Sequence, residues 1–148
     1  MTPELVSLQA QLLEEQVRLY RTLNSLAERK ERVLIQADVK ALDHIINSEQ
    51  TLILKVAEVE KRRFSAQKEL AATWDLPLEK VTLETISLRA GEEIMARCQR
   101  AGEELTEILA ELKERNQRCQ TIIKGALDVI ERTLGETGPR PKLMDRLV

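Results

Sequence analysis

Apolar and small residues recur at alternating steps of four and three from position 94 to position 133 of the 148-residue chain. We call this pattern the first apolar seam; it consists of Ile94, Cys98, Ala101, Leu105, Ile108, Leu112, Cys119, Ile122, Ala126 and Val129. Arg115 interrupts it where another apolar residue is expected. A spacing that averages 3.5 residues is typical of a helix packed lengthwise against other helices. The pattern therefore predicts a long helix over about 92–134.

A second apolar seam runs beside the first in the last third of this helix. It consists of Ile123, Leu127, Ile130 and Leu134, which follow a four-three-four spacing one residue out of step with the first seam. Together the two seams form an apolar face about twice as wide as one partner helix covers. We therefore expect this end of the helix to bind a second partner.

Two further long helices are predicted upstream, over about 4–36 and 39–72. Their apolar faces consist of Leu5, Leu8, Leu12, Leu19, Leu23, Leu26 and Val33 in the first helix, and Leu42, Ile45, Leu52, Val56, Val59, Ala66 and Leu70 in the second. Asp38 lies between them and is a suitable N-cap, because its carboxylate can accept from the free amides of a new first turn. Such a short connection makes the two helices antiparallel neighbours.

The periodicity fails over 73–91, which we interpret as a connector across one end of a helical bundle. Trp74, Pro77 and Gly91 punctuate this segment, and Thr82 is placed to cap a short turn over 83–86. We expect Trp74 to cover the end of the bundle rather than to form a ligand platform. Beyond the last helix, Gly135 is well placed to end it, and the glycine and prolines that follow cannot continue it.

Composition supports an all-α fold. The chain is rich in strong helix formers and has only one Phe, one Tyr and one Trp, whereas sheet-containing cores depend on β-branched and aromatic residues. We predict an elongated antiparallel three-helix bundle, or coiled coil, with a long C-terminal helix. It would form a single domain over 1–135, followed by a flexible tail over 136–148.

The charges give no sign of nucleic-acid binding or membrane insertion. Lys and Arg number 23 against 25 Asp and Glu, for a net charge of −2, and both signs are interspersed along the chain. The N-terminus lacks the basic and apolar stretches of a secretory signal. Glu111 with Arg115 and Glu114 with Arg118 have the spacing of ion pairs along one helix. We interpret these residues as solvated faces.

No constellation of residues suggests catalysis, a cofactor or a metal site. His44 is the only histidine and has no partner at helical spacing. Cys98 and Cys119 would lie about 30 Å apart along one helix, at about 1.5 Å per residue, too far to pair. Buried seam thiols have raised pKa values and are unreactive, and two unpaired thiols favour a reducing, cytoplasmic location. The sequence therefore predicts a protein that is not an enzyme.

Arg115 and Asn116 have two interpretations. A polar interruption in a coiled coil can fix the register of its helices. It can also mark where the intramolecular bundle ends and a free binding segment begins. We favour the second interpretation, because the second seam starts just beyond these residues.

Several short motifs resemble the FlgN family of flagellar export chaperones over roughly 17–135. They are the turn at Asp38, the connector VTLETI at 81–86, and the segments LKERNQ at 112–117 and IIKGALDVI at 122–130. The chain departs from the family in having Ala37 where glycine is usual and Lys113 where asparagine is frequent.

The resemblance implies a cytoplasmic, non-enzymatic chaperone. Such chaperones bind and shield the amphipathic terminal helices of hook-filament junction proteins and deliver them to the export gate of the flagellar type III secretion system. The family's client site maps to the C-terminal helix. The expected client-binding residues are Leu109, Asn116, Ile123, Leu127, Ile130 and Leu134.

Two further expectations concern partners. Leu143, Met144, Leu147 and Val148 in the tail would form a docking motif, with the cytosolic domain of the export gate as its possible partner. The second seam could instead be the interface of a homodimer, in which case the protein would be a structural coiled-coil adaptor or scaffold without an export role. The sequence does not distinguish a monomer from a homodimer, nor does it identify the client.

Overall fold

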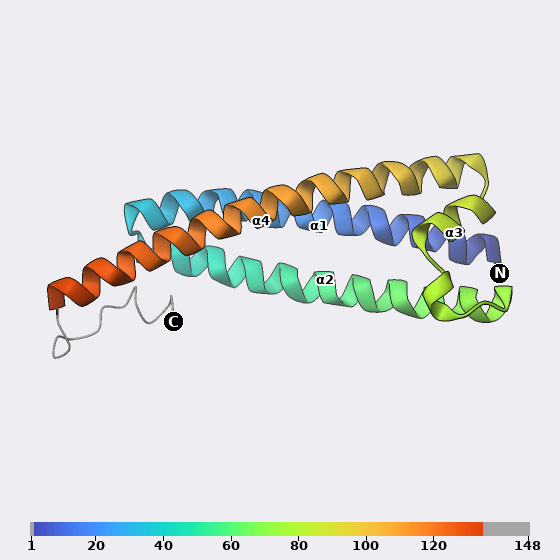
Figure 1. Ribbon diagram of the computed structural model, residues 1–148, viewed down its shortest axis with the longest axis horizontal. Coiled ribbons are helices and arrows are strands. Elements are labelled where there is room, and N and C mark those ends of the chain that lie inside the picture. Colours follow the sequence, from blue (N-terminus) through green and yellow to red (C-terminus); the bar gives the residue numbers. More distant parts are fainter. Residues whose placement is uncertain (1, 135–148) are drawn as a thin grey trace. The chain divides into compact units, whose positions relative to one another are not determined.

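A computed structural model describes residues 2–134, and these residues form helices and connecting turns only. The long helices are α1 (Thr2–Gln36), α2 (Val39–Trp74) and α4 (Glu92–Leu134), and they correspond to the helices expected over about 4–36, 39–72 and 92–134. A short 3-10 turn, η1 (Leu78–Lys80), and helix α3 (Leu83–Arg89) lie between α2 and α4. Figure 1 shows this order of elements. The predicted all-α fold with antiparallel helices and a long C-terminal helix is confirmed.

The turn between α1 and α2 is closed by local hydrogen bonds. Ala37 adopts a φ of 55°, in the left-handed region that glycine enters without a Cβ penalty. The amide of Asp38 donates to the carbonyl of Val33 at 3.2 Å, and the amide of Ala41 donates to the Asp38 carboxylate at 3.1 Å. The predicted N-cap is confirmed, and it starts α2 directly after α1 ends.

The connector is more helical than its sequence suggests. Thr82 caps α3 as expected, because its hydroxyl accepts from the amide of Thr85 at 3.2 Å. Helix α3 continues to Arg89, however, instead of ending after one turn at 86. Ile86 and Ser87 are buried, so packing extends a helix that the local pattern predicts only as a single turn.

Contacts divide the chain into two compact units. Unit 1 comprises Met1–Arg21 and Leu52–Leu109, and unit 2 comprises Thr22–Thr51 and Ala110–Val148. The expectation of a single domain over 1–135 stays a prediction.

Unit 1 contains two apolar clusters. One consists of Val6, Leu70, Ala71, Val81 and Ile86, and the other of Leu13, Val17, Ala101 and Ile108. Trp74 packs half-buried against the first cluster, as expected for a residue that covers its end, and the Arg89 guanidinium stands 4.9 Å from the indole ring. Side chains from α1, α2, the connector and α4 thus contribute to the core of unit 1, which these two clusters make up.

A polar group lies inside this core. Gln9 and Gln16 of α1 are buried, and Gln9 donates to the backbone carbonyl of Arg63 at 2.9 Å. The Arg63 guanidinium donates to the side-chain oxygen of Gln16. Burial lowers the pKa of Arg63 from its ordinary value. These bonds give the buried amides partners and join α1 to α2 within unit 1.

Unit 2 is built around a smaller cluster. Leu34 of α1, Leu42 of α2 and Cys119 of α4 are buried together, and Val33, Ile46, Ile122 and Ile123 pack around them. Cys119 is 2% exposed. The end of α1 and the start of α2 therefore pack against α4 at the level of Cys119.

Candidate functional site

The last turns of α4 leave apolar side chains incompletely covered. Between Cys119 and Leu134, the end of the described chain, no residue is fully buried. The half-buried apolar residues of this stretch are Ile122, Ile123, Ala126, Leu127 and Ile130. Val129 is 62% exposed and Leu134 is 37% exposed. Both apolar seams are thus accessible on this segment.

The lengths of the helices explain this exposure. Helix α1 ends at Gln36 and α2 begins at Val39, and the residues next to this turn pack against Cys119, Ile122 and Ile123. Helix α4 continues past the turn, as Figure 1 shows at its red end. At 3.6 residues per turn, about three turns of α4 follow Ile123. They extend beyond the helices of unit 2 that cover the preceding turns.

The predicted client-binding residues differ in how deeply the structure buries them. Ile123 packs against the core of unit 2, whereas Leu127 and Ile130 are half-buried outside that cluster and Leu134 is exposed. Asn116 is exposed on α4 in the same unit. These five residues stay a predicted site.

Leu109 belongs to unit 1, where it is 40% exposed. Its role in client binding stays a prediction. Leu143, Met144, Leu147 and Val148, the predicted docking motif, lie outside the described residues.

The favoured interpretation of Arg115 is wrong. The intramolecular core does not end at this residue, because Cys119, one turn further along α4, is buried against Leu34 and Leu42. Arg115 itself is half-buried, and its guanidinium lies 3.9 Å from the carboxylate of Glu28 on α1. A long arginine side chain can cover apolar surface while its charged end reaches the edge of the core. The seam therefore tolerates Arg115 without a break in packing.

Several polar side chains of unit 2 join α1 to α4. Arg118 of α4 donates to Glu31 of α1 at 2.6 Å, and Asn24 of α1 donates to Glu111 of α4 at 2.8 Å. Both residues of the ion pair expected along α4 contact α1, since Glu111 accepts from Asn24 and Arg115 lies near Glu28. Packing of α1 beside α4 brings partners closer than helical spacing does.

The two cysteines have no reactive features. Cys98 and Cys119 are buried and unpaired, and burial raises the pKa of each thiol. The Cys119 sulfur lies 4.0 Å from the carbonyl oxygen of Ala27. A protonated thiol in an apolar core is a poor nucleophile. These residues therefore act in packing.

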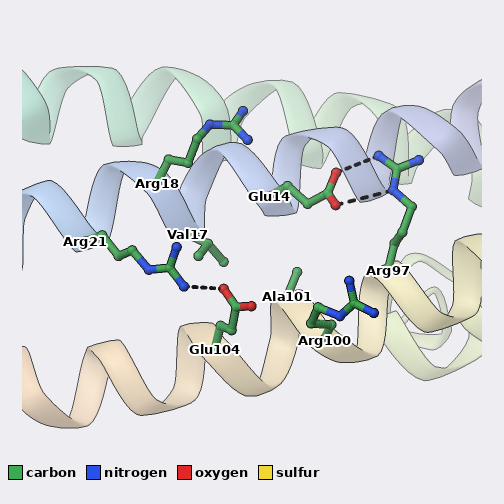
Figure 2. A pocket seen from close by; sticks show the side chains of 8 residues that line it. All are labelled: Glu14, Val17, Arg18, Arg21, Arg97, Arg100, Ala101 and Glu104. Carbon is green, nitrogen blue, oxygen red and sulfur yellow. Dashed lines mark hydrogen bonds and ion pairs between the residues drawn. The ribbon is translucent and has the colours of Figure 1, made fainter.

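Sequence reasoning missed a second surface, which lies in unit 1 between α1 and α4. We call it the arginine groove; it is lined by Glu14, Val17, Arg18, Arg21, Arg97, Arg100, Ala101 and Glu104 and has a volume of about 330 Å³ (Figure 2). The lining positions follow steps of three, one and three on both helices. This repeated spacing is present in the sequence, but only the pairing of α1 with α4 shows that the two sets face each other.

Two ion pairs cross the arginine groove. Arg97 donates from Nη2 and Nε to the two carboxylate oxygens of Glu14, at 2.5 and 3.3 Å, and Arg21 donates to Glu104 at 2.6 Å. The hydrogen bond from Arg97 holds the pKa of Glu14 below its ordinary value. Since Glu14 pairs with Arg97 and Arg21 pairs with Glu104, α1 and α4 run parallel here.

The described residues offer no metal centre and no membrane-spanning helix. Within residues 2–134, no three His, Cys, Asp or Glu side chains gather in a way that could hold a metal ion. In the same part of the chain, every helix is too polar or too short to cross a bilayer. His44, the one histidine of the chain, lies exposed on α2.

A comparison with protein families identifies a relationship over nearly the whole chain. The family model described as FlgN protein matches residues 6–140. Neither the curated proteins nor the solved structures contain a match.

Proposed function

Because the chain belongs to the FlgN family of flagellar export chaperones, which bind hook-filament junction proteins and are not enzymes, we propose that it holds its client on the open end of α4. The observation that carries this proposal is the exposure of apolar residues on about three turns of helix beyond Ile123. Apolar surface on an amphipathic helix suits a client that presents an amphipathic helix of its own.

The contact surface would be the second apolar seam, with Leu127 and Ile130 at its centre. Both side chains are half-buried, so a client helix could cover their remaining surface without unfolding unit 2. Ile123 would join this surface to the core of the unit, since it already packs against the cluster around Leu34. Asn116, exposed on the preceding turns, would add a polar contact.

Simple energetics predict a moderate affinity for the client at this surface. Full burial of an aliphatic side chain contributes about 1.5 to 3 kcal/mol, and these side chains are already partly covered. Association costs an estimated 4 to 15 kcal/mol in lost freedom. The second seam alone therefore gives weak binding, and additional contacts must supply the rest. A chaperone that releases its client at the export gate can use such an affinity.

The test is a calorimetric titration of the protein with the terminal helical segment of a hook-filament junction protein. Leu127→Asp places a charge where the client is expected to pack, so affinity should fall at least about tenfold. Thr121→Asp is the matched control, because Thr121 is exposed on the same helix and lies about 120° away around it. Equal affinities of the two variants would contradict the proposed site.

The same variant tests the alternative of a homo-oligomeric scaffold by sedimentation. If the second seam binds another copy of the chain and no client, the wild type should sediment as a dimer and Leu127→Asp as a monomer, and adding the client segment should leave the wild-type dimer unchanged. If the protein is a monomer that binds client, the sedimentation coefficient should be the same for the wild type and the variant. We propose the second outcome.

We also propose that the chain acts in the cytoplasm, where its family acts, and that its tail docks on the export gate. The support for docking is the presence in the sequence of four apolar residues, Leu143, Met144, Leu147 and Val148, after Pro139 and Pro141. Removal of residues 139–148 should leave client affinity unchanged and abolish binding to the cytosolic domain of the export gate. Unchanged binding to both partners would show that the tail has no docking role.

A further inference from the structure

One face of α2 in unit 1 is apolar and exposed. Ile53 is 55% exposed, Phe64 is 46% exposed, and Ala57 between them is exposed as well. These three residues are spaced by four and seven positions, so they follow one line along the helix. We call this line the outer face of α2. The buried row of the same stretch is centred about a third of a turn away and consists of Val56, Val59, Ala66 and Leu70.

A groove with a volume of about 540 Å³ opens on the outer face. Its lining residues all belong to α2 and to unit 1; they are Ala57, Glu60, Lys61, Arg63, Phe64 and Gln67. The small side chain of Ala57 beside the ring of Phe64 makes a depression that an apolar side chain of another helix can fill, as a knob fills a hole. Aromatic residues are also enriched in the buried centres of protein interfaces. The shape of this surface therefore suits a partner helix.

The exposed edge of the groove is positively charged. Lys61 and Lys68 are exposed and lie seven residues apart, on the side of the outer face that points away from the core. The Lys68 ammonium stands 4.6 Å from the centre of the Phe64 ring. Neither lysine makes an ion pair with any residue from 2 to 134. A partner that covers Phe64 thus meets two positive charges along one side.

The negative charge of the groove lies on its inner edge. Glu60 is the one carboxylate among the lining residues that the structure describes. Burial lowers the pKa of Arg63, and the nearby Glu60 carboxylate acts in the opposite direction. Glu60 therefore faces a charge of its own helix, whereas the lysines of the exposed edge face solvent.

We propose that this groove docks an amphipathic helix of a partner protein, with its apolar side on Ala57 and Phe64 and with carboxylates seven residues apart that pair with Lys61 and Lys68. In helices that pack lengthwise, charges beside the apolar seam determine which partners associate. The same lysines would repel a basic helix. One aromatic ring is too few to stack successive bases of a nucleic acid. The site lies in unit 1 and does not depend on the client site proposed on unit 2.

The first test measures fluorescence anisotropy of a labelled helical peptide of about three heptads, with leucine at the two seam positions and glutamate at one flanking position of each heptad. Phe64→Ser removes the ring from the groove and should weaken binding about tenfold or more. Leu88→Ser is the matched control, because Leu88 is 73% exposed on α3 in unit 1 and lies outside the groove. The control should bind within about twofold of the wild type.

The second test reverses the charges. A reference peptide with lysine in place of each glutamate should bind the wild type about tenfold more weakly than the acidic peptide. Lys61→Glu with Lys68→Glu should reverse this preference, because attraction and repulsion exchange places. Lys55→Glu with Arg62→Glu is the control with the same change in net charge, and both of its residues are exposed on the opposite side of α2 in unit 1. It should keep the preference of the wild type.

Further measurements assign the binding to this groove. Circular dichroism melting checks that every variant is folded, and Leu127→Asp should bind the acidic peptide as the wild type does. Absence of saturable binding, equal binding of the two peptides to the wild type, or equal losses in the groove and control variants would overturn the proposal. Loss of binding in Leu127→Asp, or displacement of the peptide by a short polyuridine, would also overturn it. A dimer in sedimentation that Phe64→Ser converts to a monomer would assign the groove to a second copy of the chain instead.

Discussion

Two stretches of α4 carry the same apolar repeat but differ in what covers it. In unit 1, Cys98, Ala101 and Ile108 are buried, and the last two belong to a cluster with residues of α1 and the connector. Among the residues of α4 in unit 2, which the structure describes to Leu134, Cys119 is the last buried one, and the repeat continues beyond it with every apolar side chain partly exposed. A heptad pattern identifies a face that packs against something. Whether the partner belongs to the same chain depends on how far the neighbouring helices extend.

The largest expected effect is a difference in the free energy of unfolding when a charge is introduced into each of these two stretches. Ile108→Asp buries a carboxylate without a partner in unit 1 and should lower the free energy of unfolding by about 3 kcal/mol or more. Leu127→Asp, on the half-exposed stretch, should lower it by less than about 1 kcal/mol, because water still reaches the new charge. Urea unfolding of both variants measures the difference. Equal losses would show that the second seam is ordinary core.

A smaller effect uses the two glycines inside α4. Gly125 has open space where a Cβ would be, so Gly125→Ala should stabilise the helix by up to about 1 kcal/mol. At Gly102 in unit 1, a Cβ would lie 3.3 Å from a methyl carbon of Leu83. Gly102→Ala should therefore gain less than Gly125→Ala, and the melting temperatures of the two variants compare them directly. Equal gains would mean that Leu83 moves aside without cost.

The smallest effect concerns the ion pairs that flank the buried stretch. Because Arg97 depresses the pKa of Glu14 below its ordinary value of 4.5, this pair stabilises the fold above that pH, and the stabilisation is lost as the pH falls through the depressed value. At neutral pH, Glu14→Gln should cost about 1 kcal/mol or less, since the pair is partly exposed. In urea unfolding at about pH 7 and at about pH 3, the difference from the wild type should shrink at the lower pH. A difference that does not vary with pH would contradict this account.

Much of the fold was predictable because its signals are local. The apolar repeats, the Asp38 and Thr82 caps and the buried cysteines follow from backbone hydrogen bonding and a period that each helix expresses by itself. Membership of the FlgN family also agrees with motifs that stand in the sequence. For the site on α4, only the unusually wide apolar face could be predicted from the sequence. The identification of its partner as a client protein stays a proposal.

The sequence by itself determined that this chain is helical, where its long helices turn, and which face of α4 is apolar. Tertiary structure alone decided three matters: that the core continues past Arg115 to Cys119, that α3 lengthens to Arg89, and that arginines of α1 and α4 share one groove. The reason is that helical periodicity is set by neighbours three and four residues away. The register between helices depends instead on their relative lengths and on which side chains fill the space between them, and no local spacing records either one.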